Sequence, residues 1–341
     1  MTKKIKGIAI KKAIATLLAV VLIWGAMPIT VMATTIDISG VGPFTINTGV
    51  TATVTGPITG NITVDGGTLI LNADHTIDGT VGVENGGTFN MSAGTITGAG
   101  RGVSVVHNGQ FNMSGGIITG NNNASGAGVH VSSGAHFTML GGLIYDNHST
   151  TIGGGVHVQG FDPIPDGAGG FTPVPASEQT HFTLLGGTIR NNVAATNGGG
   201  LYISRSAVAT IGTPGGNDSA ILIVGNHAIG TNAGNGNGGG MTVEVATVTM
   251  YSGTIANNTA TNRGGGVRIA HGPAGYASGF RYSHLIMHGG LISDNHALAA
   301  TGYGGGLSIN HTPGAIFSSG GVILTQTGGT ISNNTAANGD L

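Results

Sequence analysis

Side chains capable of chemistry recur at one position of this sequence, the middle of a Val-x-Val phrase that follows a run of glycines. The residues at this position are Ser104, His130, His157, Tyr202, Thr242, Arg268 and Ser308. Because alternate residues of a strand point to opposite sides, this position should form an outward row. His130 and His157 occur in successive phrases, about 5 Å apart if the phrases stack, which is close enough to share a metal ion. The sequence offers no third ligand, so we favour solvated histidines and expect neither a metal nor another cofactor.

Paired carboxylates, which would indicate a polysaccharide lyase or hydrolase, are not apparent. Asp146 and Asp294 share a register, but Asn191 and Asn257 take the same position between them. No Asp-Asp or Asp-x-Asp pair and no calcium-binding Gly-Gly-x-Gly-x-Asp repeat occurs. We therefore expect a protein that is not an enzyme, with a lyase or hydrolase kept as the alternative.

These residues belong to a recurring phrase, Phe-x-Met-x-Gly-Gly-x-Ile-x-x-Asn followed by Gly-Gly-Gly-Val-x-Val. A clear copy runs from Phe182 to Asn192 and continues with Gly198 to Ile203. The closest copies, aligned on their isoleucines, are separated by 22 and 26 residues. That period is too short for helical hairpin repeats and fits one turn of a β-solenoid.

The phrase predicts an all-β protein, a right-handed parallel β-helix with three short strands per coil. Phe137-x-Met139, Ile144 with its neighbours, and Val156-x-Val158 alternate apolar and polar residues at period two between glycine corners. The 67 glycines and the lack of a 3.6-residue apolar rhythm argue against helices. Crossovers between parallel strands strongly prefer the right hand.

An asparagine follows the aligned isoleucine by three residues in seven copies. Side-chain amides at one register can bond to their equivalents in the coils above and below. We therefore expect a structural ladder, and prefer it to a binding site because a ligand needs a few unique residues. The ladder residues are Asn121, Asn147, Asn192, Asn226, Asn258, Asn295 and Asn334.

Three segments are expected along the chain. Residues 1–33 carry five lysines, an apolar run and a small-x-small site before Thr34, which predicts a secretory signal peptide. A retained membrane anchor is the alternative. Residues 34–86 should form N-terminal coils and a cap, and residues 87–341 the main repeats. The last repeat stops in mid-coil, so we expect either the remainder of a longer surface protein or a partner that closes the coil.

The net charge limits the classes of partner, and the cysteine content limits what can stabilise the fold. Without residues 1–33, six arginines face thirteen acidic residues, a formal charge of −7. This argues against nucleic acid or anionic lipid as a partner. We also expect no membrane span in the mature chain. The absence of cysteine leaves strand stacking to stabilise the fold.

Insertions fall mostly between the Val-x-Val strand and the next Phe-x-Met strand, so they should cluster along one edge, where repeat proteins often bind. The aromatic and charged residues that we expect to bind there are Phe171, Tyr276, Phe280, Arg281 and Tyr282. Aromatic side chains beside charges suit a carbohydrate or a host surface protein. The alternative is that Phe161, Phe171 and Phe280 only pin their own loops to the coil.

The tandem Gly-Gly-x-Ile phrase with its following asparagine resembles the right-handed β-helix repeat proteins of bacterial surfaces, including the polymorphic outer-membrane protein adhesins. The resemblance covers residues 87–341 well and residues 34–86 loosely. Those adhesins typically carry Gly-Gly-Ala-Ile and Phe-x-x-Asn, whereas here the third position is Thr, Leu or Ile. The resemblance implies a secreted or cell-surface, adhesin-like protein, and a non-binding structural spacer is the other alternative.

Overall fold

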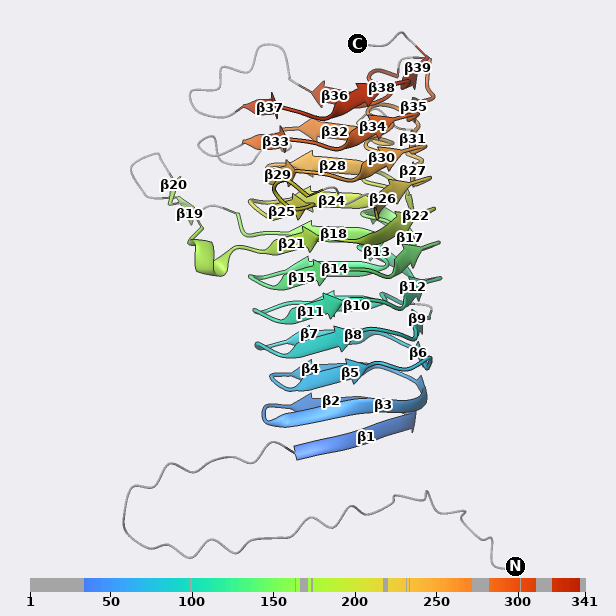
Figure 1. Ribbon diagram of the computed structural model, residues 1–341, viewed down its shortest axis with the longest axis vertical. Helices are drawn as coiled ribbons and strands as arrows, with labels where there is room; N and C mark the ends of the chain where they lie inside the picture. The colour runs from blue at the N-terminus through green and yellow to red at the C-terminus, as the bar shows by residue number, and fades with distance from the viewer. Residues whose placement is uncertain are drawn as a thin grey trace, which may run out of the picture. The chain divides into compact units, whose positions relative to one another are not determined.

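The computed structural model describes residues 34–98, 100–162, 164–165, 171–172, 174–216, 220–230, 232, 234–271, 282–300, 302–310 and 321–337. These residues form a right-handed parallel β-helix, which confirms the predicted fold class. Successive coils stack from β1 to β39, so that each strand lies on its equivalent in the previous coil (Figure 1). All the strand pairings are parallel except for one small hairpin in an insertion and one isolated bridge near the N-terminal coils.

Three parallel sheets run along the stack. The ten-stranded sheet comprises β2 (Phe44–Asn47), β4 (Ile62–Asp65), β7 (Val81–Glu84), β10 (Val103–Val105), β14 (Val129–Ser132), β18 (Val156–Gln159), β24 (Leu201–Ser204), β28 (Met241–Glu244), β32 (Val267–Ala270) and β36 (Leu307–Asn310). The seven-stranded sheet comprises β13 (Asn122–Ser125), β17 (His148–Ile152), β23 (Val193–Ala194), β27 (His227–Ala228), β31 (Thr259–Ala260), β35 (His296–Ala297) and β39 (Thr335–Ala336).

The twenty-stranded sheet takes two strands from most coils. It begins with β1 (Thr34–Val41) and β3 (Val50–Thr59). The Phe-x-Met column above them contains β5 (Thr68–Leu71), β8 (Thr88–Met91), β11 (Gln110–Met113), β15 (His136–Met139), β21 (His181–Leu184), β25 (Val208–Ile211), β29 (Thr247–Met250), β33 (Ser283–Met287) and β37 (Val322–Gln326). The isoleucine column contains β6 (Thr76–Asp78), β9 (Thr95–Thr97), β12 (Ile117–Thr119), β16 (Leu143–Tyr145), β22 (Gly187–Arg190), β26 (Ile221–Val224), β30 (Thr254–Ala256), β34 (Leu291–Ser293) and β38 (Thr330–Ser332).

Each repeat coil contains the three expected strands, and from β13 onward a further short strand follows the ladder asparagine. Residues 34–86 form coils of the same kind without this fourth strand, with β1 paired to β3 and β2 paired to β4. The insertion after β18 contains the hairpin of β19 (Ile164–Pro165) and β20 (Phe171–Thr172), and a 3-10 helix, η1 (Ala176–Glu178). The core repeat thus continues unbroken while insertions leave it at defined places.

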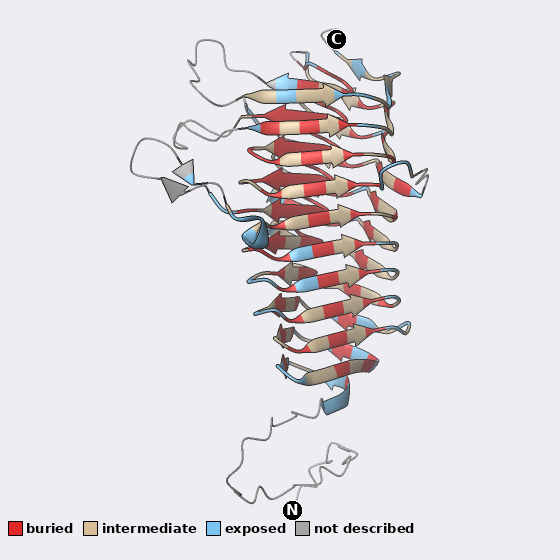
Figure 2. Cartoon of the chain, turned by 60° about the vertical axis from the view of Figure 1, so that its left-hand side comes forward, coloured by how far each residue is buried: buried red, intermediate tan, exposed pale blue. Residues whose placement is uncertain are grey.

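The interior of the coil is made of columns of identical or similar apolar side chains. Phe89, Phe111, Phe137 and Phe182 stack face to face with ring centroids 4.7 to 5.0 Å apart, and each is at most 1% exposed. Buried and more exposed residues alternate along the strands (Figure 2). Burying an aromatic side chain removes a large apolar area from water, so the columns stabilise a fold that has no other deep core.

Candidate binding face along the ten-stranded sheet

The seven expected ladder asparagines lie in one column at the corner after the isoleucine strands, and all but Asn334 are buried. Each side-chain amide Nδ2 donates to the Oδ1 of the next coil's asparagine at 2.9 to 3.0 Å, from Asn121 to Asn334. The same Oδ1 also accepts the backbone N–H of the previous asparagine, as at Asn192 and Asn226. Only the first rung is incomplete, since Asn121 Oδ1 is buried without a partner and the preceding copy carries Ala99. From Asn147 onward the column therefore holds neighbouring coils together through its own side-chain amides.

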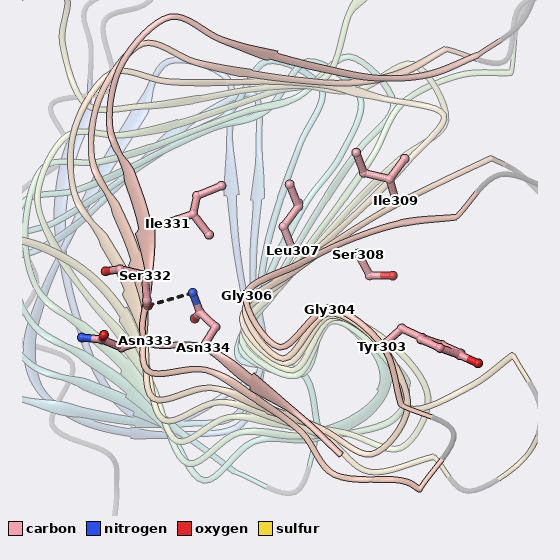
Figure 3. Close-up of a pocket in the computed structure, with 10 residues that line it drawn as sticks. All are labelled: Tyr303, Gly304, Gly306, Leu307, Ser308, Ile309, Ile331, Ser332, Asn333 and Asn334. Carbon is pink, nitrogen blue, oxygen red and sulfur yellow. Dashed lines mark hydrogen bonds between the residues drawn. The ribbon is translucent and has the colours of Figure 1, made fainter. Parts of the chain in front are cut away.

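The polar row at the middle of the ten-stranded sheet is in register, as the sequence predicts. Cα pairing links Ser104, His130, His157, Tyr202, Thr242, Arg268 and Ser308 in that order. In the last of these coils Ser308 and Tyr303 lie on the opposite side of β36 from Leu307, which points into the coil (Figure 3). The row therefore faces away from the apolar interior.

The row is nevertheless largely covered, which contradicts the expectation of solvated histidines. His157 is 2% exposed, Tyr202 6% and Arg268 8%. The cover is the first glycine of each Gly-Gly-Gly run, which turns with a left-handed φ, for example +63° at Gly153. A Cβ on Gly153 would lie 2.8 Å from the Cβ of His157. The glycine run folds back closely against the strand that follows it, and only glycine leaves room for this close contact.

His130 and His157 contact each other, with ring centroids 5.1 Å apart. His157 Nδ1 lies 2.5 Å from Ser125 Oγ and its Nε2 lies 3.2 Å from Ser204 Oγ, so both ring nitrogens have hydroxyl partners. Burial lowers the pKa of His157 well below its ordinary value, and the charges of His130 and Arg101 act in the same direction.

His130 differs from its neighbour because its Nδ1 is buried without a hydrogen-bond partner. The pKa of His130 is lowered to about 4, chiefly by burial and in addition by the charge of Arg101, while the hydrogen bond with the Gln159 side chain partly opposes both. A neutral imidazole can ligate a metal, but in the described part of the chain no three His, Cys, Asp or Glu side chains gather into a possible metal site.

A small pocket opens where the polar row meets the C-terminal ends of the sheet strands. It has a volume of about 120 Å³ and is lined by Ile152, His157, Gln159, Tyr202, Ser204, Arg205, Glu244 and Val245. The hydroxyl of Tyr202 donates to Glu244 Oε2 at 2.8 Å, and the Tyr202 ring packs edge-on against His157. The walls thus combine an aromatic ring with hydroxyl, amide, carboxylate and guanidinium groups, the mixture with which proteins orient polar ligands.

Sequence reasoning found His157 and Tyr202 but missed the other polar residues of this pocket. Gln159, Ser204 and Glu244 occupy one register position, two residues after the polar row. Aligning the copies two residues further along the chain would have revealed this second polar column.

Arg268 lies two coils beyond Tyr202. Its Nε is buried and has no hydrogen-bond partner. Burial lowers the pKa of Arg268, while Glu244 and Tyr202 raise it and Arg263 lowers it, so these groups are close enough to interact. The Arg263 guanidinium lies 5.7 Å from the centre of the Tyr303 ring. Tyr303 also borders a hollow of about 680 Å³ at the last described coil, where Leu307 and Ile331 belong to the coil interior (Figure 3).

The insertion points lie along one edge, as expected, because the residues at the strand ends are in register. Gln159, Ser204, Glu244, Ala270 and Asn310 are paired in sequence, and three of these five strands, β18, β32 and β36, lead into insertions. The coil of β24 departs from the expected placement, because β25 begins at Val208 and the extra residues lie after it, between Ile211 and Ile221. Arg205 Nη1 forms an ion pair with Asp162 Oδ2 at 3.1 Å, which ties the first insertion to the pocket.

The aromatic residues predicted in these insertions are only partly described. Tyr282 is 44% exposed and Phe161 is 41% exposed, so neither side chain is buried against the coil. The backbone of Phe171 lies in β20. The side chain of Phe171 and residues Tyr276, Phe280 and Arg281 lie outside the described part of the structure.

The aspartates considered for acid-base chemistry lie apart. Asp146 and Asp294 are at left-handed corners, with φ of 51° and 56°, separated by four coil steps. Asn191 and Asn257 take the same left-handed corner in the coils between them. No helix in the described residues is long and apolar enough to cross a membrane.

Fold and site together define a class, namely a right-handed parallel β-helix of short glycine-rich repeats with a covered polar row and a small pocket beside an insertion edge. Comparison with protein-family models, with curated proteins and with solved structures found no match to the chain.

Proposed function

We propose that the chain is exported through residues 1–33 and acts outside the cell as an adhesin-like binding protein. In this proposal the insertion edge of the β-helix contacts carbohydrate or protein on a host surface. The sequence resemblance to the polymorphic outer-membrane protein adhesins supports the class. The five lysines, apolar run and small-x-small site of residues 1–33 support the location.

The observation that carries the proposal is the convergence of the polar row and the insertion edge at one pocket. His157 and Tyr202 reach the pocket from the row, while Arg205 joins it to the first insertion through Asp162. Exposed aromatic side chains lie in the insertions at this edge, since Phe161 begins the insertion after β18 and Tyr282 ends the insertion after β32, and such residues dominate binding patches.

The proposal is tested by shortening two insertions. The segments 161–179 and 271–282 are replaced by short Gly-Ser linkers, while Thr180 and Ser283 remain because their side chains hydrogen-bond to the coil. Thr180 Oγ1 accepts the N–H of Gly134, and Ser283 Oγ accepts the N–H of Val245 and donates to Ala270 O. Because loops tolerate length changes better than coils, the variant should fold with a thermal midpoint close to that of the parent.

Attachment of the purified parent and variant is then measured on host cells and on glycan arrays. We expect attachment to fall at least about tenfold in the variant, since the aromatic anchors are removed. Undiminished attachment by a folded variant would contradict a role for the insertions and move the contact to His130, His157, Tyr202 and Arg268. A parent chain that attaches to no surface would contradict the proposal itself and favour a structural spacer.

A further inference from the structure

We infer that the outer side of the ten-stranded sheet binds an acidic polysaccharide that runs along the stack of coils. This inference rests on the proposed binding function and names a ligand class for it. Carboxylate or sulfate groups of the polysaccharide would pair with arginines, and its hydroxyl groups would enter the small pocket at Tyr202 and Glu244.

The first observation is the placement of arginine. Outside residues 1–33 the chain has six arginines and no lysine. Four of them, Arg101, Arg205, Arg263 and Arg268, accompany the polar row. Arg190 lies instead on the twenty-stranded sheet, with its guanidinium 4.8 Å from the centre of the Tyr145 ring. Arg281 is outside the described residues.

The second observation is that these arginines are held in place. Arg101 donates to Ser125 O, Ser104 Oγ and Asn123 Oδ1. Arg205 pairs with Asp162, and Arg263 lies beside the Tyr303 ring. A guanidinium fixed by protein contacts loses little side-chain entropy when it binds an anion.

The third observation is charge. Two carboxylates, those of Asp162 and Glu244, have described interactions with these four guanidinium groups. The face therefore gathers four of the six arginines of residues 34–341, a segment that as a whole carries a formal −7 from six arginines and thirteen acids. A cationic strip on an acidic protein attracts anionic ligands to that strip and repels them elsewhere.

The fourth observation is that two buried polar atoms of the row have no protein partner. Arg268 Nε is a strong donor, and His130 Nδ1 can donate or accept according to its tautomer. Buried polar groups are normally hydrogen-bonded, so an unpartnered pair in one row points to a partner outside the chain. The guanidinium group of arginine can donate two parallel hydrogen bonds to the oxygens of a carboxylate or sulfate group.

The spacing suits an extended chain. Arg101 precedes Ser104 of the row, and five coil steps separate Ser104 from Arg268. At about 4.8 Å per step the strip spans roughly 24 Å, which is the length of several linked sugar units and not of a single sugar.

Between the outer arginines lies the 120 Å³ pocket, large enough for about four waters or the hydroxyl side of one sugar ring. Its Glu244, Gln159 and Ser204 groups are acceptors and donors for hydroxyls, which favours a polysaccharide over a nucleic acid.

The full chain is tested for binding to immobilised polygalacturonate, dextran sulfate, neutral dextran and double-stranded DNA, at low and high salt. Binding to one or both acidic polysaccharides, at least about tenfold tighter than to neutral dextran and weakened by salt, is the expected result. The variants Arg205→Gln and Arg268→Gln should each lose about tenfold in affinity, and Arg268→Lys should recover part of it.

Arg190→Gln is the matched control, since it removes the same charge from another sheet and should change affinity less than about twofold. If Arg268→Gln does not fold, the more exposed Arg205 carries the test. An equal loss in Arg190→Gln, equal binding to neutral dextran, tighter binding to DNA, or no binding to either acidic polysaccharide would each overturn the inference. A chain that attaches to cells or to neutral glycans yet ignores acidic polysaccharides would retain the proposed function and lose only this ligand class.

Discussion

The asparagine ladder and the polar row of the ten-stranded sheet lie on either side of the glycine runs, and their hydrogen bonding differs. Each ladder asparagine between Asn147 and Asn295 gives and receives hydrogen bonds within its own column. The row of His130, His157 and Tyr202 instead borrows partners from other positions, such as Ser125 and Glu244. A self-satisfied column serves stability, whereas a row with unpartnered atoms retains capacity for a ligand.

Replacing Asn192 by Leu should destabilise the protein. The backbone N–H of Asn147 would lose its acceptor, Asn192 Oδ1, and Ile144 O would lose the Asn192 Nδ2 donor at a buried corner, at about 1 to 3 kcal/mol for each unsatisfied group. The comparison is Asn191→Gly, because Asn191 is exposed but has a left-handed φ of 54°, which leucine would strain. Denaturation midpoints should fall clearly for Asn192→Leu alone, and equal midpoints would contradict the structural role of the ladder.

Because of His130, we predict that the folded protein becomes less stable in mild acid. Its pKa is about 4 in the folded chain and about 6.5 when unfolded, so between these values the unfolded chain binds more protons. Stability should therefore decrease as the pH falls from 6.5 towards 4, by on the order of 3 kcal/mol from this group. His130→Gln should flatten the dependence of the denaturation midpoint on pH. Parallel pH profiles for parent and His130→Gln would refute this assignment.

At the scale of elements, the glycine run is the joint between the seven-stranded and ten-stranded sheets. Its first glycine covers the polar row, and its third glycine packs against the asparagine ladder. In one run, a Cβ on Gly155 would lie 2.7 Å from Gly200 O and 3.0 Å from Asn192 Nδ2. The joint therefore has no room for a side chain on either face.

Gly155→Ala should consequently cost about 1 to 3 kcal/mol through overpacking. Gly82→Ala is the matched control, since Gly82 sits at the outward position of β7 and the only atom within 4 Å of its added Cβ is Ile62 O at 3.8 Å. Thermal unfolding of the two variants gives the comparison, and a midpoint for Gly155→Ala that matches Gly82→Ala would show that the joint can relax.

At the scale of the whole molecule, repetition made the architecture predictable. A recurring phrase whose closest copies are 22 and 26 residues apart identifies the coil, and the aligned Ile144 and Asn147 identify its corner. The seven-stranded sheet escaped prediction because strands such as Val193–Ala194 are too short to show an alternating pattern. The burial of His157 could not be predicted because the sequence of a glycine run does not show in which direction the backbone turns.

The contact between the third glycine and the ladder joins neighbouring coils and not residues of one coil. Gly128 meets Asn147, Gly155 meets Asn192 and Gly200 meets Asn226. Every coil therefore presents the same kind of surface to the coil that precedes it, and the same kind of surface to the coil that follows it. A gene segment that encodes one whole unit can be duplicated or lost by recombination between copies without creating a mismatched joint. The reach of the protein can thus change in increments of about 4.8 Å while its cross-section stays the same.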